Sequence, residues 1–230
     1  MKTVFVTGGT GYIGSRLIKE LLRLNCTVIA LVRAGSEHQV PLGCQLVYGN
    51  ALDSATYQEA IPQGCTFVHL VGVAHPSPAK KQQFIDIDLR SIHEAVNAVR
   101  EAQVGHFVYL SVAQYPSGLM QTYQDVRAEG EQLIRTLGVP ATFVRPWYVV
   151  GPGHYWPLLL KPLYRVLKLF HATRQKAIEL DLVSLEQVIT ALIMSILVPP
   201  VDAKVLKVAD LKQISRFSQP YKIVPRLVLS

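Results

Sequence analysis

Short apolar runs alternate along the chain with longer segments in which apolar residues recur every three or four positions. Runs of the first kind predict buried strands, and the longer periodic segments predict helices with one apolar face. The expected strands are 3–9, 26–32, 44–50, 65–72, 106–112 and 141–146, and the expected helices are 12–24, 84–102 and 122–138. This alternation predicts an α/β fold, a doubly wound parallel sheet covered by helices on both faces.

The pattern changes after Pro146, where the sequence becomes rich in glycine, proline and aromatic residues. Residues 158–170 favour a helix, and 204–208 favour a last short strand. Ser184, with Gln187 three residues later, is typical of a capping box at the start of another helix. We therefore expect one domain over 1–230, in which 151–230 contributes a small C-terminal cap.

Composition narrows the classes of protein. The net charge of +7 favours binding to an anionic ligand, an acidic partner or a membrane surface. The alternative is that the protein simply has a basic surface. No block of five like charges is present, so we expect no nucleic-acid partner. The longest uncharged apolar stretch, 187–201, has 15 residues and is too short to span a bilayer. Three scattered cysteines and a start that runs straight into a strand predict a cytoplasmic protein with free thiols.

A glycine-rich turn joins the first strand to the first helix. TGGTGYIG places Gly8, Gly11 and Gly14 at intervals of three, with Thr10, Tyr12 and Ile13 between them. Glycines let the backbone approach a pyrophosphate, and the helix N-terminus offers free N–H groups. The turn therefore predicts a dinucleotide site, the alternative being a turn that only packs helix on strand.

The second strand indicates which dinucleotide is bound. NAD sites usually carry an acid about 20 residues after the glycines, to bind the ribose 2′-hydroxyl. Arg33 occupies this region, and no acid follows until Glu37. A guanidinium suits a 2′-phosphate, with Arg16 and Ser36 as candidate helpers, so we expect NADP(H) in preference to NAD(H). The alternative is an exposed Arg33 and an unselective site.

Six segments, taken in order, resemble the short-chain dehydrogenase/reductase superfamily: TGGTGYIG, GNALD, FVHLVG, VYLSV, YxxxR and RPWYVVGPG. The spacing is similar to its extended and atypical branches, which include epimerase/dehydratase-like proteins and the dehydrogenase-like accessory subunit of respiratory complex I. The resemblance implies a Rossmann-type fold, a small-molecule substrate and no metal. It also implies cofactor contacts from residues at or after the ends of strands three, four and six: Asn50, Ala51, Leu70, Val71, Gly72, Pro146, Tyr148 and Val149.

The resemblance further implies a catalytic set of Tyr123, Arg127 and Ser111, all touching the cofactor. The family uses a tyrosine as acid or base, with a lysine four residues later that stabilises the phenolate and holds the ribose. Residues i and i+4 share a helix face, so Tyr123 and Arg127 can both face the cofactor. Arg127 replaces the lysine, and Val112 and Ala113 stand where the family serine is usual.

Two functions remain open on this evidence. One is an NADP-dependent oxidoreductase or related epimerase or dehydratase that uses Tyr123. The other is a non-catalytic nucleotide-binding protein, an assembly subunit or redox sensor, in which Arg127 only pairs with Glu131 on the helix surface. His75 is a further candidate acid or base, although a loop histidine of this kind is more often structural.

Two weaker patterns complete the sequence evidence. Asp86, Asp88 and His93 are spread along one expected helix, which favours a solvated face over a metal site. Lys161, Arg165 and Lys168 form a basic stripe within 156–170, which predicts either weak contact with a membrane surface or a cap helix packed on the sheet.

Overall fold

The computed structural model describes residues 1–115, 118, 120–160, 162, 164, 167 and 169–217, with side chains except those of 156, 171, 172, 176 and 215–217. Seven parallel strands form the main sheet in the order β3-β2-β1-β4-β5-β6-β9. Their bounds are β1 Thr3–Thr7, β2 Thr27–Val32, β3 Gln45–Tyr48, β4 Thr66–His69, β5 His106–Leu110, β6 Ala141–Val144 and β9 Ala203–Leu206. The order reverses direction beside β1, which confirms the predicted doubly wound sheet.

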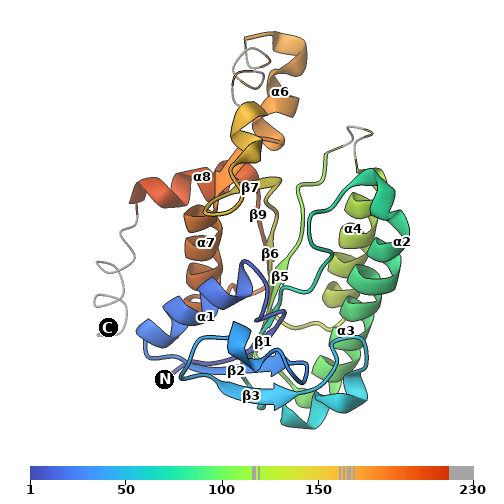
Figure 1. Ribbon diagram of the computed structural model, residues 1–230, viewed down its shortest axis with the longest axis vertical. Helices are drawn as coiled ribbons and strands as arrows, with labels where there is room; N and C mark the ends of the chain where they lie inside the picture. Colours follow the sequence, from blue (N-terminus) through green and yellow to red (C-terminus); the bar gives the residue numbers. More distant parts are fainter. Residues whose placement is uncertain are drawn as a thin grey trace.

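Helices cover both faces of the sheet, as Figure 1 shows. On one face lie α1 (Gly14–Arg23) and α7 (Leu185–Leu197), and on the other lie α3 (Arg90–Ala102) and α4 (Gln121–Arg135). The strands between them are buried on both sides, which explains why they are continuous apolar runs. Gly130 lets α4 approach the sheet, because a Cβ there would meet the Tyr109 hydroxyl at 2.8 Å.

Two apolar cores follow from this layering. One joins α1 and α7 to the sheet through residues such as Leu17, Leu21 and Leu192, all with no exposed surface. The other lies under α3 and α4 and includes Phe67 and Phe107, whose rings pack 5.1 Å apart. All three cysteines are free thiols, with Cys26 and Cys65 buried, as expected from their scattered positions.

The helix expected over 84–102 is interrupted at its start. Residues Phe84–Leu89 form a π-helical turn, η5, after the short helix α2 (Lys81–Gln83), and α3 follows without a break. A π turn inserts an extra residue and rotates the side chains that follow it, and such turns often occur at functional sites. This rotation brings Asp88 inward, with 1% exposure, so the expected solvated face is wrong for this residue.

Part of the expected cap belongs to the main body. The strand β9 extends the main sheet beside β6, and α7 packs against the sheet behind the predicted Ser184–Gln187 capping box, which is present. The cap itself consists of β7 (Tyr148–Val150) paired with β8 (Leu182–Ser184), η6 (Trp156–Leu160) and α6 (His171–Glu179). The sequence patterns missed α6 and α8 (Val208–Phe217).

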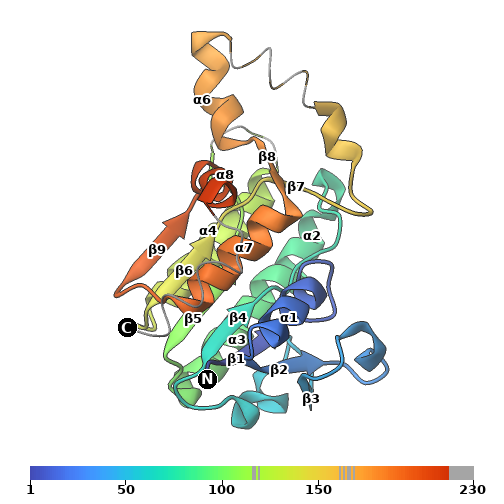
Figure 2. The ribbon, with the colours of Figure 1, turned by 90° about the vertical axis from the view of Figure 1, so that its left-hand side faces the viewer.

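The cap projects beyond the sheet. In both perpendicular views α6 stands clear of the body, at the end of the molecule opposite β3 (Figures 1 and 2). Among the described residues, none of the helices has the length and apolarity needed to cross a membrane.

Candidate dinucleotide site and tyrosine–arginine pair

The glycine loop after β1 combines two kinds of glycine. At Gly8, with φ of +78°, and at Gly14, an added Cβ would collide with neighbouring backbone, so packing alone requires both glycines. At Gly11 a Cβ would meet only the Gly8 carbonyl, at 3.2 Å, and this residue is exposed. The helix α1 then begins without a side-chain cap and without an acid in its first turn. These are the features that a bound pyrophosphate requires.

A cleft of about 440 Å³ opens beside this loop, at the carboxyl ends of the strands. Nine of the predicted cofactor-binding residues line it: Gly8, Thr10, Gly11, Arg33, Asn50, Ala51, Leu70, Val71 and Gly72. Lys80, Gln83 and Ile87 also line it, and no sequence motif marks them. We call this cleft the open half of the site, since its position and lining fit the adenosine and pyrophosphate of a dinucleotide.

Arg33 is exposed at the edge of the open half, near Asn50 and Ala51. The nearest acid after β2, Glu37, accepts a hydrogen bond from the Gly35 N–H at 3.1 Å. Hydrogen bonds from backbone N–H groups, its own and that of Gly35, lower the pKa of Glu37 and engage it within its own loop. Thus Arg33, rather than an acid, is the charged group that the loop after β2 presents to the cleft, and Lys80 is a second basic residue of its lining.

Two other expected contributions near this cleft differ in the structure. Arg16 donates to the Tyr12 carbonyl at 2.7 Å and stacks on the Tyr12 ring, so the structure does not bring it to the cleft lining. The Asn50 side chain accepts from the Leu52 N–H at 3.0 Å and shapes its own turn. Tyr12, Ile13 and Gly14 lie at the start of α1 and pack in the body rather than lining the cleft.

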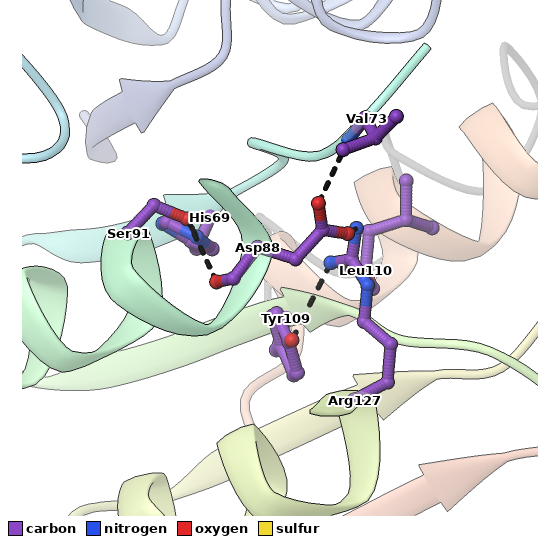
Figure 3. Close-up of polar contacts among 7 residues, drawn as sticks. All are labelled: His69, Val73, Asp88, Ser91, Tyr109, Leu110 and Arg127. Atoms are coloured by element: carbon purple, nitrogen blue, oxygen red, sulfur yellow. Dashed lines mark hydrogen bonds and ion pairs between the residues drawn. The ribbon is translucent and has the colours of Figure 1, made fainter. Parts of the chain in front are cut away.

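Arg127 is enclosed by protein, although its position on α4 matches the expectation. It has 4% exposure, and its Nη2 atom lies 2.5 Å from Oδ1 of Asp88 (Figure 3). Its Nη1 atom donates to the Leu110 carbonyl at 3.1 Å and to the Tyr109 hydroxyl at 3.4 Å. Burial alone would lower the pKa of Arg127, but its neighbours Tyr109, Tyr123 and Asp88 raise it, so the guanidinium stays charged.

The ion pair also holds the loop after β4. Oδ2 of Asp88 accepts from the Val73 N–H at 2.9 Å (Figure 3). A Cβ on Gly72 would collide with the Arg127 guanidinium, so only glycine fits beside the pair. Gly72 therefore separates the guanidinium from the open half, and we call the enclosed Arg127–Asp88 pair with its contacts the sealed half.

A line of buried hydrogen bonds supports Asp88 from behind. The Thr7 hydroxyl lies 2.8 Å from Nδ1 of His69, whose Nε2 lies 3.2 Å from the Ser91 hydroxyl. Ser91 donates to the Asp88 carbonyl at 3.0 Å, so His69 donates through Nε2 and accepts through Nδ1. Burial, and then the charge of Arg127, lower the pKa of His69 to about 3, which makes it a neutral support rather than a proton carrier.

The alternative in which Arg127 pairs with Glu131 on the helix surface is also wrong. Glu131 is buried at 1% exposure and pairs with Arg145, through bonds of 2.8 and 2.5 Å to its two carboxylate oxygens. The partner of Arg127 is instead 39 positions earlier in the chain, on the π turn. One buried and one partly buried ion pair therefore tie α4 to η5 and to the residue that follows β6.

Tyr123 is half-buried beside the sealed half. Its ring lies 4.9 Å from Phe84, and the Arg127 guanidinium carbon lies 5.3 Å from the ring centre. The predicted sharing of one helix face is thus confirmed. However, Asp88 balances the charge that would stabilise a phenolate, so the family's electrostatic activation is weakened.

The serine position also departs from the family pattern. Ser111 is 3% exposed, and its hydroxyl has no partner within the described part of the chain. Val112 and Ala113 are buried and apolar. The two positions where the family serine is usual therefore carry no hydroxyl.

The far end of the expected cofactor path lies in the cap. Pro146 accepts from the Ala113 N–H at 2.9 Å, and Tyr148 and Val149 are half-buried on β7. His75 stacks on His154 with ring centres 4.6 Å apart, and His154 also contacts Tyr12 at 5.3 Å. These three rings join the loop after β4, the glycine loop and the cap. His75 therefore has packing contacts, as expected if it is a structural loop residue.

Comparisons with known proteins agree with this geometry. The model of the NAD dependent epimerase/dehydratase family matches residues 4–182. The chain belongs to this family. The fold is similar to the Bordetella bronchiseptica enzyme WbmH in complex with NAD+, with a TM-score of 0.66 and 20% identity over 90% of this chain and 75% of that one. It is also similar to Thermus thermophilus UDP-glucose 4-epimerase in complex with NAD, with a TM-score of 0.65 and 18% identity over 93% and 82%.

A curated relative of another kind is the mitochondrial NADH-ubiquinone oxidoreductase 40 kDa subunit of Neurospora crassa. It is 23% identical over 65% of this chain and 41% of its own length. The chain spans 41 to 55% of the length of the first curated relatives that it matches. Membership of the superfamily and the Rossmann-type fold are therefore confirmed, and the reaction remains to be assigned.

Proposed function

We propose that this chain binds a nicotinamide dinucleotide, with preference for NADP(H), and holds it without the tyrosine-based turnover of its family. The observation that carries this proposal is the Arg127–Asp88 pair, because it removes the cation from the cofactor side of Gly72. Such a protein would act as an assembly subunit or redox sensor in the cytoplasm. The Neurospora relative, named as a subunit of a larger oxidoreductase, is consistent with the first role.

The residues of the open half fit the adenosine side of the cofactor. The N-terminus of α1 and Gly11 would receive the pyrophosphate, Ala51 and Leu52 would contact the adenine, and Arg33 would pair with a 2′-phosphate. When bound, the nicotinamide would supply hydride chemistry. The structures with bound NAD share less than 25% identity with this chain, so their cofactor does not decide the choice here.

Calorimetric titration with NADPH and NADH tests the binding proposal. We expect one site per chain and a lower dissociation constant for NADPH. Equal or tighter binding of NADH would remove the NADP preference, and no binding of either would remove the function itself.

An oxidoreductase or epimerase that uses Tyr123 is the second candidate. The observation in its favour is that a cation still lies 5.3 Å from the Tyr123 ring centre. Turnover of carbonyl compounds and nucleotide sugars by the parent protein and by Tyr123→Phe separates the candidates. A loss of roughly 10²–10⁴-fold in the variant would establish acid–base catalysis and overturn the non-catalytic proposal. We expect no turnover that depends on Tyr123.

A further inference from the structure

The cap carries an apolar surface that nothing in the described chain covers. Its tip, defined here as the described residues between Tyr155 and Phe170, holds four of the twelve exposed large hydrophobic side chains of the described chain. Leu159 and Leu169 are each 82% exposed, Phe170 is 60% exposed and Tyr155 is 57% exposed. The remaining eight lie on other elements, and exposed apolar side chains are common on protein surfaces.

Most of the tip extends away from the sheet, whereas Tyr155 follows His154, whose ring contacts Tyr12 of the glycine loop. Both views show η6 and α6 beyond the ends of the strands, at the end of the molecule opposite β3 (Figures 1 and 2). The expected packing on the body is seen in part, because Tyr164 packs against the core that joins α1 and α7 to the sheet, whereas Leu159 and Phe170 stay exposed. Lys161, Arg165 and Lys168, the predicted basic stripe, lie outside the described residues.

The charge of this sequence is one-sided. Residues 156–178 contain five lysines and arginines and no aspartate or glutamate. These five positive charges account for most of the net charge of +7. Arg174, on α6, is exposed. Aromatic and aliphatic side chains next to lysine and arginine are the composition found where proteins contact the interface of an anionic bilayer.

We propose that the cap tip docks the protein on the surface of an anionic lipid bilayer. Leu159, Leu169 and Phe170 enter the headgroup region, Tyr155 lies at the interface, and Arg174 on α6 pairs with lipid phosphates. The inference rests on the cap alone and does not depend on which dinucleotide is bound or on whether it is turned over.

Other occupants fit the tip less well. A second copy of the chain would bring two positively charged segments together, and their repulsion opposes such an interface. A nucleic acid would match the charge but would leave the exposed leucines without an apolar partner. A bilayer surface satisfies both the charge and the apolar side chains at a protruding site.

Co-sedimentation with phosphatidylcholine vesicles, with and without phosphatidylserine, tests the proposal on the full chain. We expect the protein to sediment with the phosphatidylserine vesicles, and less so at high salt. Leu159→Ser with Phe170→Ser should lower the partition coefficient about tenfold or more, because two apolar side chains no longer enter the membrane. Arg174→Glu should lower it about fivefold on phosphatidylserine vesicles.

Leu42→Ser provides the matched control. Leu42 is 99% exposed in the loop before β3, at the end of the molecule opposite α6, and its loss should leave sedimentation unchanged. Unchanged nucleotide affinity and circular dichroism show that each variant is folded. Absence of sedimentation at low salt, or an equal loss in Leu42→Ser, would overturn the proposal. A second outcome would also overturn it. This is a dimer, detected by light scattering, that does not bind vesicles and that the double substitution Leu159→Ser with Phe170→Ser dissociates.

Discussion

The open and sealed halves of the site meet at Gly72 but differ in what their polar groups do. In the open half, Gly11 and Arg33 are exposed and line a cleft. In the sealed half, Arg127 and Asp88 satisfy each other with almost no exposed surface. Substitutions in the first should therefore change ligand affinity, and substitutions in the second should change stability. A retained cofactor site thus does not establish a retained reaction.

The largest expected effect is on the sealed half. Arg127→Met should lower the free energy of unfolding by roughly 3–5 kcal/mol, because it leaves the Asp88 carboxylate buried without its partner. Adding Asp88→Leu should recover much of this loss, since the apolar pair needs no desolvation of charge. Urea denaturation of both variants measures the difference.

Arg135→Met is the control for this comparison. Arg135 lies on the same helix with its guanidinium 4.6 Å from the Phe143 ring and its side chain exposed, so its loss should cost about 1 kcal/mol or less. If Arg127→Met is no more destabilising than Arg135→Met but abolishes nucleotide binding, Arg127 belongs to the cofactor site and the comparison of the two halves is wrong.

The support behind Asp88 predicts how stability depends on pH. The pKa of His69 is about 3 in the folded protein, below its ordinary value of 6.5, so the unfolded chain binds more protons between these values. Its contribution to stability is complete above about pH 6.5 and is lost as the pH falls toward 3. At about pH 4.5 this loss amounts to roughly 2–3 kcal/mol.

Denaturation of the parent protein and His69→Asn at neutral and acidic pH isolates this contribution. The variant keeps a side-chain donor and acceptor but does not titrate, so its stability should fall less with acid. His106, whose pKa is lowered to about 4 by burial and then by Lys2, remains in both proteins and cancels. Equal pH dependence in the two proteins would show that folding does not lower the pKa of His69.

A valine at position 11 tests the open half. Gly11→Val should lower dinucleotide affinity by roughly 10–100-fold, because its side chain would occupy the space next to the glycine loop that the pyrophosphate needs. Urea denaturation should change little, since a Cβ at this position meets only the Gly8 carbonyl. Titration of the variant with unchanged affinity would place the ligand elsewhere.

The smallest expected effect concerns cofactor choice. Arg33→Ala should weaken NADPH binding by about tenfold and leave NADH binding nearly unchanged, because only NADPH carries the 2′-phosphate. Arg16→Ala is the control, since Arg16 is engaged with Tyr12 outside the cleft. An equal effect of both substitutions on NADPH would show that the preference, if present, comes from overall charge.

The sequence by itself determined the architecture and the open half. Apolar runs mark the six N-terminal strands, Gly8, Gly11 and Gly14 mark the turn into α1, and Ser184 with Gln187 marks the start of α7. These signals are local, because burial on both faces, a tight turn and a helix cap each depend on residues a few positions apart. Most of the cleft lining follows from them, since parallel strands end at the same edge.

Only the tertiary structure decided the sealed half. The π turn rotates Asp88 into the core. Arg127 lies 39 positions later, and it reaches Asp88 only because α3 and α4 pack side by side on the same face of the sheet. The pairing of Arg145 with Glu131 and the entry of β9 into the sheet are likewise contacts between distant segments. The YxxxR spacing places Tyr123 and Arg127 on one face of a helix, but the charge available to Tyr123 depends on a carboxylate that this spacing does not specify.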